Sequence, residues 1–200
     1  MTWTVARSRV LTRSEIQAVL ADLKRKARRS PNTAQNLILF RLACCCGLRA
    51  SELTRLRLCD LRVSSTKPTI KVPKTIAKGA KERIVPLWWD GSTLDDLRAW
   101  KAAREAQGAL GSDSLLVTRT GGQIDRLNAR KRFQACCRVL GAERHVTIHD
   151  GRHSFISHAL HAGRSIAEVR DAAGHSNIAT TSVYTHLVSD GDETVGNLFD

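Results

Sequence analysis

The chain has 200 residues, of which 42% are hydrophobic, and this composition excludes a disordered or collagen-like protein. Lys and Arg number 32 against 19 Asp and Glu, so the formal charge is +13 and the isoelectric point is about 10.2. That value lies above the isoelectric point of about 9 that is typical of a nucleic-acid-binding domain, and we expect a polyanionic partner. A charge surplus that serves only solubility is the alternative.

The cysteines and the apolar segments indicate the cellular compartment of the protein. The six cysteines form a run at 44–46, a single Cys59 and a pair at 136–137, and none has C-x-x-C spacing. We expect them to be small buried hydrophobic residues of an intracellular, cytoplasmic protein. The longest apolar stretch, NLILFRLACCCGL, contains Arg41 and is too short to span a bilayer, and MTWTVARSRV lacks a signal core, so no membrane segment is expected.

The first half of the chain predicts two helices. Thr12 and Glu15 form a T-x-x-E capping box, and apolar residues then recur at helical spacing, so a helix is expected to begin at Thr12. A second helix is expected from Thr33 to about Cys46, ending before Gly47. Arg49 lies just past that end.

The segment 58–87 predicts a short antiparallel sheet. Two β-rich pieces, TIKVP and RIVPL, flank the basic turn AKGAKE. Trp88 and Trp89 follow the second piece, and we expect core packing for both rather than stacking on nucleic acid. The rest predicts helices at 93–106, 126–140, 148–161, 165–173 and 177–188. The expected fold is α+β and mostly helical, in one domain over 1–200.

One tyrosine is present, so a tyrosine that acts chemically can only be Tyr184, in HSNIATTSVYTHL. His175 precedes it by nine positions. In the segment TIHDGRHSF, His149 and Arg152 are three residues apart and share one face of the predicted helix. These segments can converge in the fold.

Two arginines are candidates for anion binding. Arg152 falls within an apolar stripe of its helix, and a buried guanidinium needs an anionic partner, which is either an internal carboxylate or a bound phosphate. Arg49, in GLRASEL, stands beside a helix start, where Glu52 can orient it. Taken alone, each of these residues is a weak signal.

Their order is specific. GLRASEL, a basic β-turn, H-x-x-R, GH and a tyrosine nine residues later together resemble the catalytic domain of the tyrosine recombinase, or phage integrase, family over nearly the whole chain. The resemblance implies helices with a small three-stranded antiparallel sheet. It also implies six catalytic residues: Arg49, Lys78, His149, Arg152, His175 and Tyr184. Within AKGAKERIVPL, Lys78 matches the family's hairpin lysine better than Lys74 or Lys81.

The resemblance implies site-specific DNA cleavage and rejoining through a 3′-phosphotyrosyl intermediate, without metal, ATP or other cofactor. Tyr184 would be the nucleophile, Lys78 the general acid, and Arg49, Arg152 and His175 the groups that stabilise the transition state. His149 would be either the proton acceptor or another phosphate ligand. Partners would be double-stranded DNA and three further protomers on paired DNA sites, with a monomer or weak oligomer in the free state and a nucleoid location when bound.

Two other functions are compatible with these residues. One is a non-catalytic or inactive DNA-binding relative, and the other is a type IB topoisomerase, which uses the same chemistry to relax supercoils. Retention of all six groups argues against the first, and the short length against the second.

The chain departs from the family in three places. LTRSEIQAVL, at residue 11, resembles the start of the catalytic domain, so residues 1–10 are expected to be an extension and the amino-terminal core-binding domain to be absent. The chain is then either a fragment or a naturally short member, and the opening methionine favours the latter. Gly151 replaces the usual leucine, costs about 1 kcal/mol in a helix, and is expected to loosen the presentation of Arg152. The acidic tail 189–200 is expected to dock on a neighbouring protomer or on its own domain.

Overall fold

A computed structural model of the chain describes residues 5–185. Within this range the α-helices are α1 (Arg13–Ala27), α2 (Pro31–Cys44), α3 (Ala50–Leu53), α4 (Gly91–Ala106), α5 (Arg126–Cys137), α6 (Ile148–His161), α7 (Ile166–Ala173) and α8 (Ala179–Ser182). The strands are β1 (Leu61–Arg62), β2 (Thr69–Val72) and β3 (Arg83–Pro86). The 3-10 turns are η1 (Arg7–Arg9), η2 (Leu58–Asp60), η3 (Lys78–Ala80) and η4 (Arg138–Leu140).

The first two helices begin at polar caps. At α1 the predicted capping box is confirmed, because the Glu15 amide donates to the Thr12 hydroxyl (3.1 Å) and the Thr12 amide donates to the Glu15 carboxylate (2.8 Å). α2 begins earlier than predicted, since Ser30 caps it and Pro31 occupies the first position, where a missing amide hydrogen costs nothing. It also ends two residues early, and Gly47 follows with φ of +63°.

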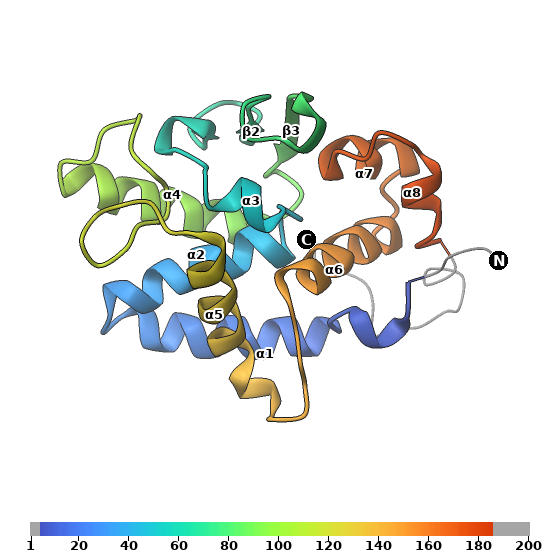
Figure 1. Cartoon of the computed structure of the whole chain (residues 1–200), viewed down its shortest axis with the longest axis horizontal. Coiled ribbons are helices and arrows are strands. Elements are labelled where there is room, and N and C mark those ends of the chain that lie inside the picture. The colour runs from blue at the N-terminus through green and yellow to red at the C-terminus, as the bar shows by residue number, and fades with distance from the viewer. Residues whose placement is uncertain (1–4, 186–200) are drawn as a thin grey trace.

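The predicted antiparallel sheet is confirmed. TIKVP supplies β2 and RIVPL supplies β3, with Ile70 opposite Val85, and the two-residue β1 pairs with the other edge of β2, which gives the order β1-β2-β3. α7 packs against β3, so the sheet and the last part of the chain meet beside α6 (Figure 1).

Two helices form the centre of the molecule. α2 is buried on all sides over residues 37–44 and packs on α1, α4, α5 and α6. In α6 the predicted stripe around Arg152 is buried, and so is nearly every other residue of the helix. The exceptions are His149 near the start of the helix, which is exposed, and His161 at its end, which is partly exposed. α6 is therefore a mostly buried element, and it carries two of the candidate site residues, His149 and Arg152.

Gly151 has a role that the sequence did not predict. A Cβ atom on Gly151 would lie 2.9 Å from the Cys44 sulfur and 3.4 Å from the Ala43 Cβ, so the missing side chain is what lets α6 approach α2 this closely. The expected loosening around Arg152 is therefore not what the packing indicates. A leucine at this position would force the two helices apart.

Some local expectations were wrong. Trp88 and Trp89 lie in the turn between β3 and α4; Trp89 is buried at 4% exposure, as expected, but Trp88 is 48% exposed. Cys59 is exposed, whereas the other five cysteines are buried, and all six are free thiols. The predicted helix 177–188 is only the single turn α8 followed by a turn that contains Tyr184; residues 186–188 and the tail 189–200 lie outside the described range.

Over residues 5–185, no helix is long and apolar enough to cross a membrane. The same range contains no group of three or more His, Cys, Asp or Glu residues placed to hold a metal ion.

Candidate active site

Arg152 is a buried cation without a carboxylate partner. Its side chain projects from α6 and the residue is 2% exposed. One guanidinium nitrogen donates to the Gly47 carbonyl oxygen (2.7 Å) and another to the Ala173 carbonyl oxygen (2.5 Å), and Arg152 forms no ion pair with any described residue. Burial, together with the charges of Arg49 and Arg83, lowers the pKa of Arg152 to about 9. The site therefore holds positive charge that a bound anion would stabilise.

Arg49 is oriented by Glu52, as the sequence predicted. Glu52 is fully buried, and its carboxylate accepts hydrogen bonds from Arg49 (3.1 Å) and, through both oxygens, from Arg83 (2.7 Å each). Burial alone would raise the pKa of Glu52, but hydrogen bonds and charge from Arg83 and Arg49 outweigh it and lower that pKa to about 2. Glu52 thus stays ionised and fixes both guanidinium groups.

The carboxyl end of α7 gathers the three arginines. Three successive carbonyl oxygens each accept from a different guanidinium: Ala172 from Arg83 (3.0 Å), Ala173 from Arg152 (2.5 Å) and Gly174 from Arg49 (3.2 Å). The last carbonyls of a helix lack partners within the helix and carry partial negative charge, so cations are favoured there. Gly174 adopts φ of +70°, and a Cβ on it would lie 2.6 Å from the Arg83 Cδ. The chain needs glycine here.

His175 follows this helix end directly. Its Nδ1 shares a hydrogen bond with the Thr181 hydroxyl (2.9 Å), which ties α7 to α8. Burial, and then the charges of Arg152 and Arg49, lower the pKa of His175 to about 3, so the ring is neutral at pH 7. The structure therefore brings Arg49, Arg152 and His175 together at one place.

Tyr184 lies in the turn after α8 and is 3% exposed. Its hydroxyl is 2.6 Å from Nδ1 of His153, a residue that the sequence analysis did not single out. Burial raises the pKa of Tyr184 to about 12, although Arg152 and Arg9 act in the opposite direction. In this state Tyr184 is a neutral phenol bound to a buried histidine.

His149 lies on the exposed end of α6 and meets His153 edge to face, with 4.4 Å between the ring centroids. Its pKa is lowered by burial and by Arg152. Arg9, another unpredicted neighbour, belongs to η1 and donates to the Asp150 carboxylate (2.8 Å). The described part of the predicted extension, residues 5–10, therefore packs onto α6.

Lys78 is the predicted site residue that the structure does not bring to the others. It is exposed on η3, in the connection between β2 and β3, and makes no hydrogen bond or ion pair with any residue of the described range. The connection turns through Gly79 (φ 75°) and Ala80 (φ 52°).

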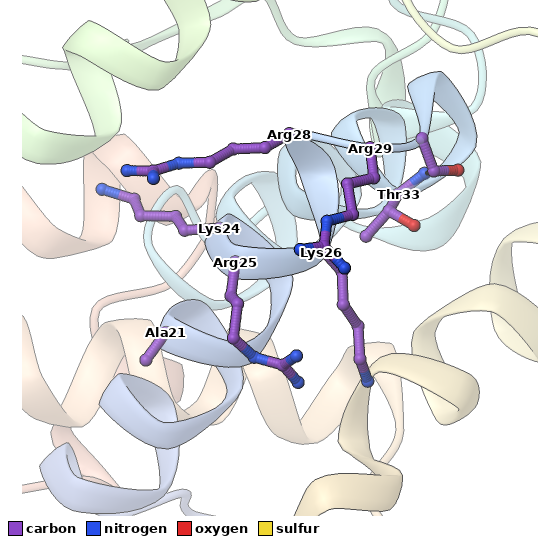
Figure 2. Close-up of a pocket in the computed structure, with 8 residues that line it drawn as sticks. Ala21, Lys24, Arg25, Lys26, Arg28, Arg29 and Thr33 are labelled. Carbon is purple, nitrogen blue, oxygen red and sulfur yellow. Dashed lines mark hydrogen bonds between the residues drawn. The ribbon is translucent and has the colours of Figure 1, made fainter.

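Two of the open hollows on the described surface are lined by cationic side chains. One borders the site and is lined by Ala50 of α3, by the start of α5 with Arg126 and Arg130, and by His149. The other lies at the corner between α1 and α2, where five cationic side chains gather (Figure 2): Lys24, Arg25, Lys26, Arg28 and Arg29. None of the six predicted catalytic residues lines this second hollow.

Comparisons with known proteins agree with this geometry. A model of the phage integrase family matches residues 9–190. Tyrosine recombinase XerC of Actinobacillus pleuropneumoniae serotype 7 is 33% identical over 78% of this chain and 49% of its own length, and XerC of Xanthomonas campestris pv. campestris is 37% identical over 70% of this chain and 41% of its own. The chain thus spans about half the length of the curated relatives it matches.

Solved structures give the same fold. The XerH site-specific recombinase in a post-cleavage complex with its palindromic difH substrate superimposes with a TM-score of 0.72 at 22% identity, over 90% of this chain and 50% of that one. XerA recombinase superimposes with a TM-score of 0.69 at 20% identity, over 93% of this chain and 59% of that one. With the matched family model, these findings show that the chain belongs to the phage integrase family of tyrosine recombinases.

Proposed function

We propose that this chain is the catalytic domain of a site-specific DNA recombinase that cleaves and rejoins strands through a covalent 3′-phosphotyrosine at Tyr184. The observation that carries the proposal is the buried Arg152, which has only carbonyl partners and lies beside Arg49 and His175. The cluster holds three guanidinium groups and one carboxylate, Glu52, which pairs with Arg49 and Arg83, so its positive charge exceeds its negative charge. A DNA phosphodiester supplies that charge in a geometry that guanidinium groups match.

The first chemical step follows from these groups. The Tyr184 oxygen attacks phosphorus, the bond to the 5′-oxygen breaks, and the departing oxygen takes a proton. Arg49, Arg152 and His175 would stabilise the extra negative charge on the non-bridging oxygens of the transition state. With the Thr181 hydroxyl as donor to Nδ1, His175 carries its proton on Nε2 and can donate it to phosphate.

Lys78 is proposed as the acid for the departing oxygen. Its exposure on a connection between strands suits a group that reaches the leaving oxygen when DNA is bound. His149, exposed beside the hollow that Arg126 and Arg130 line, is proposed as a further phosphate ligand. This hollow supports DNA passing along the start of α5 and α6.

The assembly is also part of the proposal. The XerH and transposon integrase structures to which the chain is similar are complexes with DNA. We infer four protomers on paired double-stranded sites, a single catalytic domain over 1–200, and docking of the acidic tail 189–200 on a neighbouring protomer. The free thiols suit a reducing compartment such as the cytoplasm, where the protein would lie on the nucleoid when bound.

Covalent capture tests the proposal. A nicked duplex that loses the short fragment carrying the new 5′-hydroxyl after cleavage cannot be resealed, so the protein stays attached and migrates more slowly on a denaturing gel. Wild type should be captured and Y184F should not, although both bind the duplex. Binding without capture by wild type would instead support a non-catalytic relative, and relaxation of a supercoiled plasmid without strand exchange would support a topoisomerase.

A further inference from the structure

His153 is a buried histidine whose only side-chain hydrogen-bond partner among residues 5–185 is the proposed nucleophile. Nδ1 of His153 is 2.6 Å from the Tyr184 hydroxyl, and the two residues are 1% and 3% exposed. We propose that His153, rather than His149, is a catalytic residue that accepts the phenol proton of Tyr184 as the tyrosine attacks. This inference rests on the proposed function above.

The proposed transfer requires the Tyr184 hydroxyl to donate to Nδ1 of His153. The two atoms are 2.6 Å apart, and in the neutral tautomer with its proton on Nε2 the ring offers the Nδ1 lone pair to the phenol hydrogen. We assign this tautomer, in which Nε2 is buried and has no hydrogen-bond partner among the described residues. Burial and neighbouring charge lower the pKa of His153 to about 4, so the ring is neutral at pH 7 and has a lone pair available for the proton.

Tyr184 needs such an acceptor. Its phenol is buried, and burial raises its pKa to about 12, so very little phenolate exists at neutral pH. As the bond between the Tyr184 oxygen and phosphorus forms, the phenol proton moves to Nδ1. The bond from phosphorus to the 5′-oxygen breaks and that oxygen takes a proton from Lys78. On resealing, the protonated His153 returns the proton to the departing phenol oxygen.

The charges around His153 keep its ring neutral until the reaction begins. The titratable and charged groups that face it come from α6, η1 and the turn after α8: His149, Asp150, Arg152, Arg9 and Tyr184. Asp150 is engaged by Arg9 (2.8 Å) and by Thr147, so its charge is partly neutralised. The cations disfavour protonation before attack, and the negative charge that develops on phosphate favours it during attack.

His149 fits this task less well. It is exposed, and its ring contacts His153 rather than Tyr184, with 4.4 Å between the centroids. A role of His153 in positioning alone is the competing explanation. Asparagine separates the two roles, because its side-chain oxygen can accept the hydrogen bond from Tyr184 near the place of Nδ1 but is not basic.

The test uses DNA with sulfur in place of the 5′-bridging oxygen, because a thiolate leaves without a proton and the acid step drops out. Single-turnover capture is measured between pH 5.5 and 9.5. Wild type should show a flat profile, whereas H153N and H153F should fall at least about 100-fold at pH 7 and rise with pH. H158N is the control, since His158 is buried on the same helix but bonds to the Leu11 carbonyl, and it should keep the flat profile.

Replacement of the single tyrosine by 3,5-difluorotyrosine gives a second readout. The more acidic phenol should restore capture to H153N by at least about tenfold, since it ionises without a base. The inference would be overturned if H153N captured DNA at a rate within about threefold of wild type and with the same pH profile, or if fluorination of the tyrosine did not restore capture to H153N. If both variants fail to fold, fluorinated wild type decides: an unchanged rate at pH 7 supports a base and a large gain contradicts one.

Capture by wild type distinguishes a failure of this inference from a failure of the proposed function. If wild type captures no DNA at any pH, the recombinase proposal fails. If wild type captures DNA and His153 is dispensable, only the role of His153 fails.

Discussion

The arginine cluster explains why single residues at this site should have separable effects. Two guanidinium nitrogens of Arg83 donate to the two oxygens of the Glu52 carboxylate, and this ion pair stabilises the fold. Within the described residues the hydrogen-bond partners of Arg152 are carbonyl oxygens, and Arg49 is partly exposed. Loss of the Glu52 carboxylate should therefore lower the free energy of unfolding, whereas changes to Arg152 should lower the rate of DNA cleavage.

R152K should keep the charge and lose the reaction. Lysine cannot donate in two fixed directions to the Gly47 and Ala173 carbonyls and to a phosphate, so single-turnover capture should fall at least about 100-fold while DNA affinity changes little. R41K is the matched control, because Arg41 is equally buried but pairs with Asp96 away from the site. Normal capture by R152K would contradict the proposed role.

E52Q should destabilise the protein in a pH-dependent way. It leaves Arg83 and Arg49 without their carboxylate, and we expect a loss of about 3 kcal/mol in the free energy of unfolding at pH 7. The pKa of Glu52 lies below its ordinary 4.5, at about 2, so this stabilisation is complete above pH 4.5 and lost as the pH falls toward 2. Urea unfolding of wild type and E52Q should give a difference that shrinks over that range; a constant difference would argue against the ion pair.

Tyr184 can be titrated alone, because the chain has one tyrosine. Absorbance near 295 nm, with Y184F as the baseline, should show a phenol pKa of about 12 in the free protein, raised by burial. A midpoint near 10, the ordinary value for tyrosine, would mean that Tyr184 is exposed to water in solution.

At the residue scale the sequence predicted some neighbours at the candidate site and missed others. Arg49, Arg152, His175 and Tyr184 were predicted from their order along the chain. Arg83 was missed because it looks like one residue of an alternating strand, and its pairing with Glu52 depends on the fold. His153 had one signal, four residues after His149 on the same helix face, but its contact with the tyrosine is tertiary.

At the scale of elements, the contact of α2 with α6 positions the site. α6 carries Arg152 and His153 and packs directly against Cys44 and Ala43 of α2 at Gly151. Helix starts were predicted well, since a capping box is local in sequence. The role of Gly151 was predicted wrongly because helix propensity describes an isolated helix and takes no account of a neighbour 2.9 Å away. The length of the last helix was overestimated, since a turn rather than a helix carries Tyr184 to His153.

G151A should therefore destabilise the protein although alanine is the better helix former. The added methyl group would press on Cys44 and Ala43, and we expect a loss of about 1 to 3 kcal/mol in the free energy of unfolding. G91A is the matched control, because Gly91 is the first residue of α4 and nothing lies within 4 Å of its Cβ position. Equal stability of the two variants would show that α2 and α6 are not packed this closely.

At the scale of the whole molecule, positive charge gathers at more than one place. One is the arginine cluster beside Tyr184, and another is the basic corner between α1 and α2 in Figure 2, which holds none of the predicted catalytic residues. The family resemblance gave the fold as a whole, but nothing local in the sequence distinguishes a catalytic arginine from a surface one.

The double variant R28A/R29A tests that separation. It removes two cations from the basic corner, so we expect single-turnover cleavage of DNA at saturating protein to stay within about threefold of wild type. The salt dependence of DNA binding, measured in parallel, reports whether these cations contact phosphate. A loss of tenfold or more in the cleavage rate at saturating protein would mean that Arg28 or Arg29 contributes to the cleavage step, which would contradict this separation.

The covalent link itself tests the central claim most directly. After capture on end-labelled DNA, trypsin cuts after Arg170 and, because no Lys or Arg follows, releases the segment 171–200 with the single tyrosine. The account predicts that mass spectrometry finds nucleotide on Tyr184 through a 3′-phosphate, and that the other DNA product has a 5′-hydroxyl that polynucleotide kinase labels. Attachment to another residue, or through a 5′-phosphate, would contradict it.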